Sequence, residues 1–336
     1  MKILITGSAG FIGSALSIKL LDEGHSILGV DNINGYYSKK LKKSRLKRHL
    51  NHDRYIHSYI NLQNLNKLNI LFKNNNFDLV INLAAQPGVR YSIENPKEYI
   101  KNNIDTFFNI LECCRNFKIK NLIYASSSSV YGLNTITPFK EDYPLSTPLN
   151  LYAATKISNE LMAHSYSHLY KINTVGLRFF NVYGPFDRPD MLLQKFMQSF
   201  LNNKVMPIFN YGKHLRDFTY IDDITEAISR IVKKIEQKKI SSSKKTKPKE
   251  LISSNVYNVG RSNPMLLSDI IAILENNLGR KIKKRYLPIQ LGDIPNTYAD
   301  VSLFEKNFNY SPKTDAALGI HKFLEWYFSY FNNQFD

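Results

Sequence analysis

Residues 2–13 read KILITGSAGFIG, an apolar stretch typical of a buried strand followed by glycines at positions 7, 10 and 13 and the start of a helical pattern. Glycines at this spacing permit a tight turn, close approach of a ligand to the backbone and close packing of the helix on the strand. Because the first N–H groups of a helix have no partner within it, a pyrophosphate can bind them. The stretch therefore predicts a dinucleotide-binding turn.

Strand and helix patterns alternate through the first half of the chain. Strands are expected at 2–6, 26–31, 79–84, 121–125 and 173–179, and helices at 11–23, 99–115 and 152–170. Repeated strand–helix–strand units predict an α/β fold, a Rossmann-type doubly wound parallel sheet covered on both faces.

The pattern loosens after about residue 180, which indicates a smaller C-terminal α/β lobe for the substrate. We expect residues 1–180 to bind the cofactor and carry the catalytic helix, and residues 181–336 mainly to bind the substrate. Residues 237–254 are polar and are expected to form a mobile surface loop.

Composition excludes several classes of protein. With 336 residues, 43% of them hydrophobic, the chain can bury a large core, which rules out disorder, collagen-like repeats and a small disulfide scaffold. The formal charge of +17 is a feature of proteins that bind nucleic acids. The basic runs 39–48 and 233–249 contain no aromatic residues for stacking, so we expect a solvated surface and no nucleic-acid partner.

The cysteines and the lengths of the apolar runs predict a cytoplasmic protein. Cys113 and Cys114 are adjacent and so are poor disulfide partners, which favours a reducing compartment. The first apolar run, Ile3–Ile5, is too short for a signal peptide, and no apolar run is long enough to cross a membrane. No metal site is expected.

Asp31 ends the second strand, 18 residues after Gly13. A carboxylate there can accept hydrogen bonds from both hydroxyls of an adenosine ribose and would repel a 2′-phosphate. The position therefore favours NAD over NADP, and a simple helix cap is the alternative reading.

A tyrosine and a lysine lie four residues apart in YAATK, at Tyr152 and Lys156, and so share one helix face. A phenol, with a pKa of about 10, is a poor base at neutral pH, and a nearby ammonium stabilises its phenolate. The cluster Ser126–Ser129 ends a predicted core strand, where one hydroxyl could bind the oxygen being oxidised. This set predicts an oxidoreductase-type site.

Together these elements resemble the extended short-chain dehydrogenase/reductase family of nucleotide-sugar epimerases and dehydratases. NLAAQ at 82–86, RFFNVYGP at 178–185 and RDFTYIDD at 216–223 extend the resemblance along nearly the whole chain. The resemblance implies the catalytic set Ser127, Tyr152 and Lys156. It also implies NAD contacts from the following residues: Gly7, Gly10, Phe11, Ile12, Gly13, Asp31, Asn32, Asn61, Leu62, Leu83, Ala84, Ala85, Tyr152 and Lys156.

Within the family the chain is most similar to the branch that acts on UDP-glucuronate, through DNINGYY at 31–37, QPGVRYS at 86–92 and GPFDRPDM at 184–191. That similarity implies a UDP-sugar substrate. Its expected contacts are Arg90, Ser128, Ser129 and Arg188 near the sugar carboxylate, Asn181 in the sugar site, and Arg216 and Asp293 at the phosphate and ribose.

Three positions depart from the family pattern: Asn61 replaces a usual Asp, Pro87 a usual Ala, and Asn181 a Thr common in the glucuronate branch. Asn at 181 is usual in epimerases of neutral sugars, so other UDP-hexoses (UDP-glucose, UDP-N-acetylglucosamine or its uronic acid) stay open as substrates. The dehydratases carry an acidic pair where this chain has Ser128 and Ser129, which disfavours dehydration.

The implied reaction interconverts UDP-glucuronate and UDP-galacturonate. Bound NAD oxidises C4 while Tyr152 takes the hydroxyl proton, and the 4-keto sugar turns and is reduced on its other face. Helices 99–115 and 152–170 resemble those that pair in dimers of this family, so a homodimer is also expected.

Overall fold

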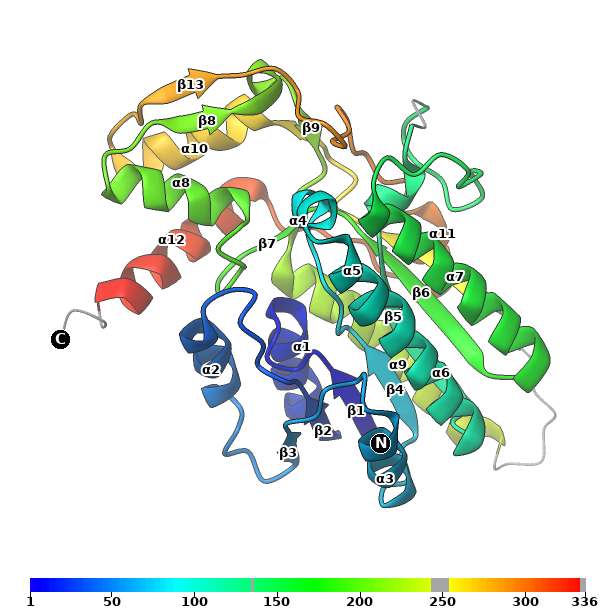
Figure 1. Ribbon diagram of the computed structural model, residues 1–336. Coiled ribbons are helices and arrows are strands. Elements are labelled where there is room, and N and C mark those ends of the chain that lie inside the picture. The colour runs from blue at the N-terminus through cyan, green and yellow to red at the C-terminus, as the bar shows by residue number, and fades with distance from the viewer. Residues whose placement is uncertain (134–135, 243–253, 333–336) are drawn as a thin grey trace.

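A seven-stranded parallel sheet forms the centre of the protein (Figure 1). The computed structural model describes residues 1–133, 136–242 and 254–332. The strands lie in the order β3-β2-β1-β4-β5-β6-β11, and all neighbours pair in parallel. Their bounds are β1 (Lys2–Thr6), β2 (Ser26–Val30), β3 (Tyr55–Ser58), β4 (Leu79–Asn82), β5 (Asn121–Ser127), β6 (Asn173–Phe179) and β11 (Ser254–Val259). The predicted Rossmann-type α/β fold is confirmed.

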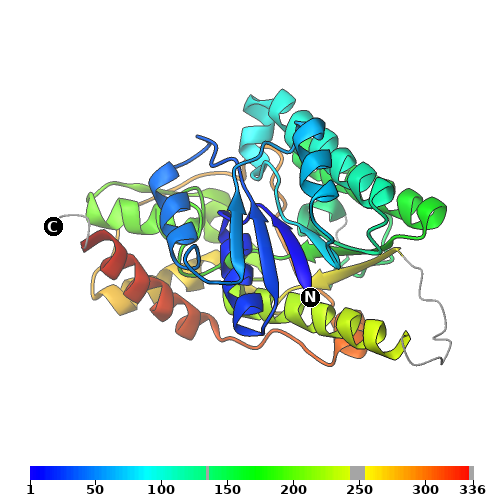
Figure 2. The ribbon, with the colours of Figure 1, turned by 90° about the horizontal axis from the view of Figure 1, so that it is seen from below.

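Helices cover both faces of this sheet, as Figure 2 shows. Helices α1 (Phe11–Asp22) and α9 (Ile221–Ser242) pack on one face, and α3 (Leu65–Lys73), α6 (Thr106–Asn116) and α7 (Leu151–Tyr170) cover the other. Successive residues of a strand point to opposite faces, so each face has its own apolar core. In β1, Ile3 and Ile5 belong to the first core and Leu4 to the second.

The smaller lobe lies above the carboxyl ends of the strands (Figure 1). Its short strands pair two by two: β7 (Val182–Tyr183) with β10 (Thr219–Tyr220), β8 (Met206–Ile208) with β13 (Lys284–Tyr286), and β9 (Leu215–Arg216) with β12 (Met265–Leu266). Its helices are α8 (Leu192–Leu201), α10 (Leu267–Leu278) and α12 (Ala316–Asn332), while α11 (Ser302–Phe308) packs against β11 and α9 of the central layers.

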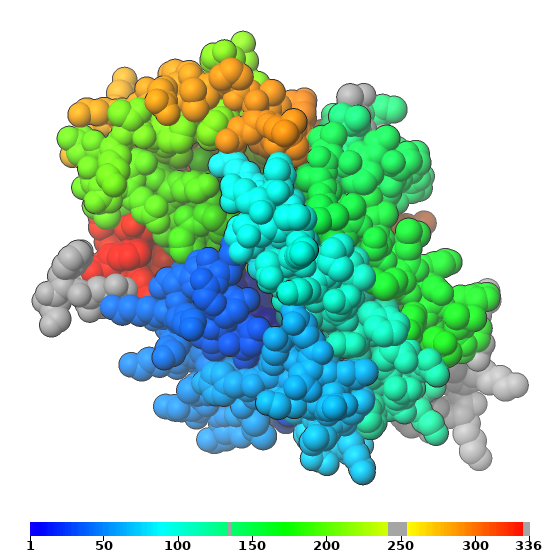
Figure 3. Space-filling view, viewed as in Figure 1, coloured from blue at the N-terminus to red at the C-terminus, as the bar shows by residue number. Residues whose placement is uncertain are grey.

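Shorter elements connect these layers. They are α2 (Lys39–Lys47), α4 (Val89–Glu94), α5 (Pro96–Tyr99), the π-helical turn η1 (Ile100–Asp105), and the 3-10 turns η2 (Ser128–Tyr131) and η3 (Phe209–Gly212). In Figure 3 the cyan segment that carries α4 lies between the blue N-terminal segments and the green and orange lobe. None of the helices in the described part of the chain has both the length and the apolar character that a membrane span needs.

The strands and helices expected from sequence are present within a few residues of their predicted bounds. The sheet, however, takes its edge strand β11 and the covering helix α9 from beyond residue 180. The expected assignment of cofactor and substrate to residues 1–180 and 181–336 stays a prediction. Of the loop expected at 237–254, the first residues are helical, because α9 extends to Ser242, and 243–253 lie outside the described residues.

Candidate active site

A cavity of about 650 Å³ opens at the carboxyl ends of the central strands. The predicted catalytic and cofactor-binding residues all line it, as do Arg90, Ser128, Ser129, Asn181, Arg188 and Asp293 from the predicted substrate set. Arg216 lines a neighbouring cavity of about 610 Å³, which shares Arg90, Asn181 and Asp293 with the first. The fold therefore gathers the predicted site residues around two adjoining hollows.

The backbone of the glycine turn lies so close to neighbouring backbone atoms that side chains would not fit. A Cβ on Gly7, whose φ is +71°, would lie 2.8 Å from the backbone nitrogen of Ala84. A Cβ on Gly13 would lie 2.1 Å from the carbonyl oxygen of Gly7, far inside van der Waals contact. Helix α1 follows with Gly10 as its N-cap, no side-chain cap and no acidic residue in its first turn. Its first N–H groups are thus suited to an anion.

Asp31 is held beside this turn by backbone donors. Its Oδ2 accepts a hydrogen bond from the Ala9 N–H at 3.2 Å, and its Oδ1 accepts one from the Ile33 N–H at 2.8 Å. Asn61, where the family usually has Asp, accepts a hydrogen bond from the Gln63 N–H at 3.0 Å and also lines the cavity. Both side chains therefore have fixed positions at the adenosine end of the expected cofactor site.

The tyrosine–lysine pair lies in the first turns of α7, which begins after Asn150. The Asn150 side chain caps the helix by accepting a hydrogen bond from the Ala153 N–H at 2.9 Å. The ammonium of Lys156 donates to the Ala125 carbonyl at 2.9 Å and lies 6.0 Å from the centre of the Tyr152 ring. This contact joins α7 to the end of β5, the strand that contains Ser127.

The serine cluster is ordered by its own hydrogen bonds. The Ser127 hydroxyl accepts from the Ser129 N–H and donates to the Ser129 hydroxyl, both at 3.2 Å. Ser128 is buried and begins the turn η2. No acidic side chain stands at these positions, as the sequence predicted.

The predicted sugar-binding cation is already paired with a carboxylate. Arg188 donates from Nε to Asp190 Oδ1 at 2.9 Å and from Nη2 to Asp190 Oδ2 at 3.0 Å. Burial raises the pKa of Asp190, and the Arg188 charge more than offsets this, so the net pKa is lowered and the pair is ionised. Asp190 also lines both cavities, although it was not among the predicted site residues.

The other predicted substrate residues also have protein partners. Arg216 donates from Nη2 to Asp293 Oδ1 at 3.1 Å. The Arg90 guanidinium lies 4.9 Å from the centre of the Phe209 ring, in a cation–π arrangement. The Asn181 carboxamide accepts a hydrogen bond from the Thr297 hydroxyl at 3.0 Å. These contacts fix the positions of side chains that line the two cavities.

Residues 3–260 match the sequence profile of the NAD dependent epimerase/dehydratase family. The chain belongs to that family. Protein CapI of Staphylococcus aureus is 50% identical over 98% of this chain and 99% of its own length. UDP-glucuronate 4-epimerase 4 of Arabidopsis thaliana is 41% identical over 99% of this chain and 76% of its own length.

A solved structure from the same group shares the fold over nearly its full length. The UDP-glucuronic acid 4-epimerase of Bacillus cereus, in complex with UDP-glucuronic acid and NAD, superposes with a TM-score of 0.87 at 33% identity. The superposition covers 97% of this chain and 98% of that one.

The epimerase/dehydratase family is NAD-dependent, and the residues of this chain fit that cofactor. The backbone of the glycine turn leaves no room for side chains, and α1 presents uncapped N–H groups to a pyrophosphate. Asp31 would bind the adenosine ribose, and Lys156 lines the same cavity. Among the described residues, no group of three or more His, Cys, Asp or Glu side chains is arranged to hold a metal ion.

Burial is the largest cause of the pKa shifts of Tyr152 and Lys156. Burial raises the pKa of Tyr152, while its hydrogen bond with Ser127 and the charge of Arg188 act in the opposite direction and only in part offset it. Burial also lowers the pKa of Lys156 to about 8, and Glu160 limits the fall. The sequence pattern pointed to Lys156 as the group that activates the phenol. Ser127 and Arg188 oppose the effect of burial on the Tyr152 pKa, and activation of the phenol by Lys156 stays a prediction.

A buried ion pair behind the site was missed from sequence. Glu160 accepts from Arg178 Nε at 3.0 Å and Nη2 at 2.7 Å, and from the Ser126 hydroxyl at 2.5 Å. This pair fixes α7 to β5 and β6, one helical turn beyond Lys156. The spacing of Lys156 and Glu160 at i and i+4 is the signal that could have indicated it.

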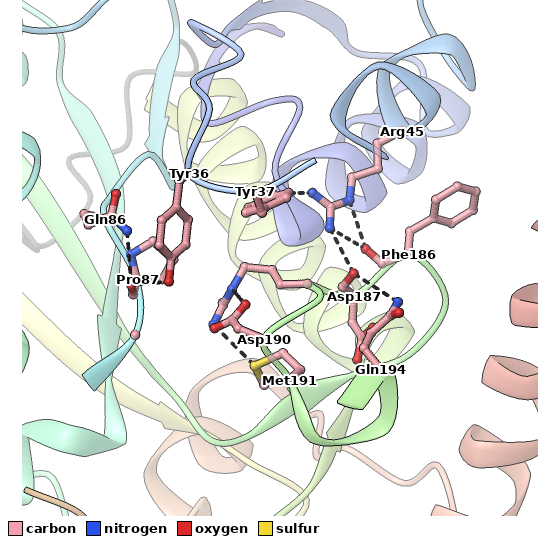
Figure 4. Close-up of polar contacts among 12 residues, drawn as sticks. Tyr36, Tyr37, Arg45, Gln86, Pro87, Phe186, Asp187, Asp190, Met191 and Gln194 are labelled. Carbon is pink, nitrogen blue, oxygen red and sulfur yellow. Dashed lines mark hydrogen bonds and ion pairs between the residues drawn. The ribbon is translucent and has the colours of Figure 1, made fainter. Parts of the chain in front are cut away.

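Two further cavity residues were not predicted. Tyr36 lines the cavity and donates to the Pro87 carbonyl at 3.4 Å, as Figure 4 shows. Lys195 of α8 lines both cavities and adds a positive charge on the same side as Arg90 and Arg188. The sequence offered no spacing rule for either residue, because their elements meet only in the folded chain.

Proposed function

We propose that the protein is a UDP-glucuronate 4-epimerase that interconverts UDP-glucuronate and UDP-galacturonate. One observation carries the proposal: the Arg188 guanidinium lines the same cavity as Tyr152, and its charge partly offsets the rise in the Tyr152 pKa that burial causes. A hexuronate whose C4 hydroxyl faces Tyr152 carries its carboxylate only two carbons away. The similarity to relatives that bear this name supports the same substrate.

The residues divide the proton chemistry among them. Bound NAD supplies a hydride acceptor for C4, which can return the hydride, and a positive charge near the phenol. Tyr152 takes the proton of the C4 hydroxyl and gives it back when the sugar is reduced on its other face. Ser127 donates a hydrogen bond to the C4 oxygen. Lys156, fixed on the Ala125 carbonyl, supplies a buried positive charge on the same helix face.

The geometry also disfavours 4,6-dehydration. Elimination requires one group to protonate the leaving hydroxyl and another to take the C5 proton. The positions after Ser127 hold the hydroxyls of Ser128 and Ser129, which cannot act as general acids at neutral pH. They can instead donate hydrogen bonds to a sugar carboxylate.

The second candidate is a 4-epimerase of another UDP-hexose, including UDP-N-acetylglucosamine, its uronic acid or UDP-glucose. Two observations favour it. Asn181 lines the cavity, and Asp190 already balances the charge of Arg188. A neutral sugar would leave this ion pair undisturbed.

Proton NMR of the purified protein with UDP-glucuronate, without added NAD, decides between the candidates. We expect UDP-galacturonate to appear without added NAD, since the cofactor is regenerated in each cycle. The mixture should approach an equilibrium near unity, since the two sugars differ only in configuration at C4. If UDP-glucuronate stays unchanged even with NAD while UDP-glucose or UDP-N-acetylglucosamine is epimerised, the first candidate fails and the second stands.

We also propose that the protein is a cytoplasmic homodimer joined through α6 and α7. These helices pack against each other, and they expose Phe108 (44%), Leu161 (67%) and Leu169 (60%). Apolar side chains on neighbouring helices are suited to cover the same helices of a second copy. Cys113 and Cys114 of α6 are buried free thiols, as expected in a reducing compartment.

A further inference from the structure

Arg45, on α2, is a fully buried arginine to which the proposed reaction gives no role. Its guanidinium donates from Nε and Nη2 to the carbonyl of Phe186, at 2.9 and 2.7 Å. Nη2 also donates to the Asp187 carbonyl at 3.2 Å. Figure 4 shows this planar group facing both carbonyls, in the segment that leads directly to Arg188.

The other edge of the same guanidinium faces the cofactor turn. Nη1 donates to the Ala9 carbonyl at 3.4 Å and to the Tyr37 hydroxyl. The Ala9 N–H in turn donates to Asp31. The backbone of Arg45 is held as well, because its carbonyl accepts from the Ser14 hydroxyl of α1 at 3.1 Å. One side chain thus joins the glycine turn to the segment that carries Arg188.

That segment needs external support. Phe186 has a φ of +64°, which is unfavourable for a residue with a side chain. Its ring is enclosed by Trp326, at 4.8 Å between ring centres, and by the Arg48 guanidinium, at 4.5 Å. Neither carboxylate oxygen of buried Asp187 has a hydrogen-bond partner among the described residues. Gln194 Nε2 donates to the Asp187 carbonyl at 3.4 Å, and the shorter carbonyl contacts of Arg45 are the main polar anchors of this backbone.

We propose that Arg45 is a positioning residue for the sugar site, which holds the segment 186–187 against the cofactor turn and so sets the place of Arg188. The inference rests on the proposed function. A planar fork with donors on both edges is required, because the carbonyls and the turn lie on opposite sides of it. A lysine, with a single ammonium, can reach one side only.

The test compares Arg45→Met and Arg45→Lys with Lys47→Met, which removes a positive charge from an exposed position of the same helix. Steady-state kinetics give kcat and KM for UDP-glucuronate, and inhibition gives the Ki of UDP. We expect Arg45→Met to raise the KM for the sugar nucleotide by about tenfold or more, because a displaced Arg188 no longer meets the sugar. Arg45→Lys should give an intermediate value, and Lys47→Met a value like that of the wild type.

The Ki of UDP separates positioning from a general loss of structure. Arg216 and Asp293, the expected nucleotide contacts, lie on other segments, so the Ki of UDP should stay within about threefold of the wild-type value. A parallel rise of KM and Ki, or no change in either, would overturn the proposal. If Arg45→Met does not fold, Arg45→Lys carries the same comparison. If wild-type protein turns over another UDP-sugar instead, the proposed function fails and the Arg45 comparison is made with that sugar.

Discussion

At the scale of single residues, the role of a charged side chain depends on the partner that the fold gives it. The sequence motif GPFDRPDM indicated Arg188 as a carboxylate-binding group, and the structure adds that Asp190 occupies its Nε–Nη2 edge. A guanidinium offers a second bidentate edge, formed by Nη1 and Nη2. A sugar carboxylate can use that edge while Asp190 keeps the side chain in place.

Arg188→Gln should therefore impair the uronate selectively. The change removes charge-assisted hydrogen bonds to the carboxylate, so kcat/KM for UDP-glucuronate should fall by about 100-fold. Binding of UDP-glucose, measured by calorimetry, should change much less. Arg230→Gln is the control, since Arg230 has an exposed side chain on α9 and lines neither cavity. Equal losses for both sugars, or unchanged turnover of UDP-glucuronate, would contradict the assignment.

At the scale of elements, long and periodic segments were predictable and short ones were not. The helix expected at 152–170 is present because its apolar spacing and the cap at Asn150 act locally. The helix expected at 99–115 contains the π-helical turn η1. Buried Asn103 in that turn accepts from the Gln86 N–H and donates to the Gln86 carbonyl, and no local pattern reveals a contact between residues 17 apart. Strand β3 was missed because it is four residues long and only its first residue, Tyr55, is buried.

Asp187, in the segment between Gly184 and Met191, makes the free energy of unfolding depend on pH. Burial raises the pKa of Asp187 from 3.8 to about 8, so the folded protein keeps this carboxyl protonated at neutral pH. The unfolded chain ionises it near pH 4. Between these two values the unfolded state binds fewer protons, so stability falls as pH rises, with a slope of up to about 1.4 kcal/mol per pH unit.

Asp187→Asn should remove that slope and raise the free energy of unfolding, most clearly near pH 8. Urea unfolding at several pH values between 5 and 8 measures it. Asp142→Asn, at an exposed position, is the control and should leave the slope unchanged. If the Asp187→Asn protein shows the same decline with pH as the wild type, Asp187 is ionised in the folded state and the account of this segment is wrong.

At the scale of the whole molecule, the two parts of the chain are interleaved. The fold class and the residues around the cavity could be predicted, because the glycine turn, Asp31 and the Tyr152–Lys156 pair each obey a local rule. The seventh strand could not be placed, since β11 pairs with β6 across a separation of 80 residues, with Ser254 opposite Thr174. The partners of Glu160, Arg188 and Arg45 also depend on segments that meet only after folding.

The proposed homodimer predicts a clear effect of one surface change. Wild-type protein should have the mass of two chains by light scattering after gel filtration. Leu161→Glu places a charge within the exposed apolar face of α7 and should give single chains. Leu318→Glu, at a half-exposed position of α12, should leave the dimer intact. A wild-type mass of one chain, or a dimeric Leu161→Glu protein, would contradict this interface.

The most direct test of the account is to run the UDP-glucuronate reaction in D2O and follow it by proton NMR. We expect UDP-galacturonate that retains protons at both C4 and C5, because the hydrogen of C4 is transferred to bound NAD and returned without exchange with water. Ser128 and Ser129, which follow Ser127, cannot take the C5 proton at neutral pH. Deuterium at C4 or C5 of the product, or no product at all, would contradict it.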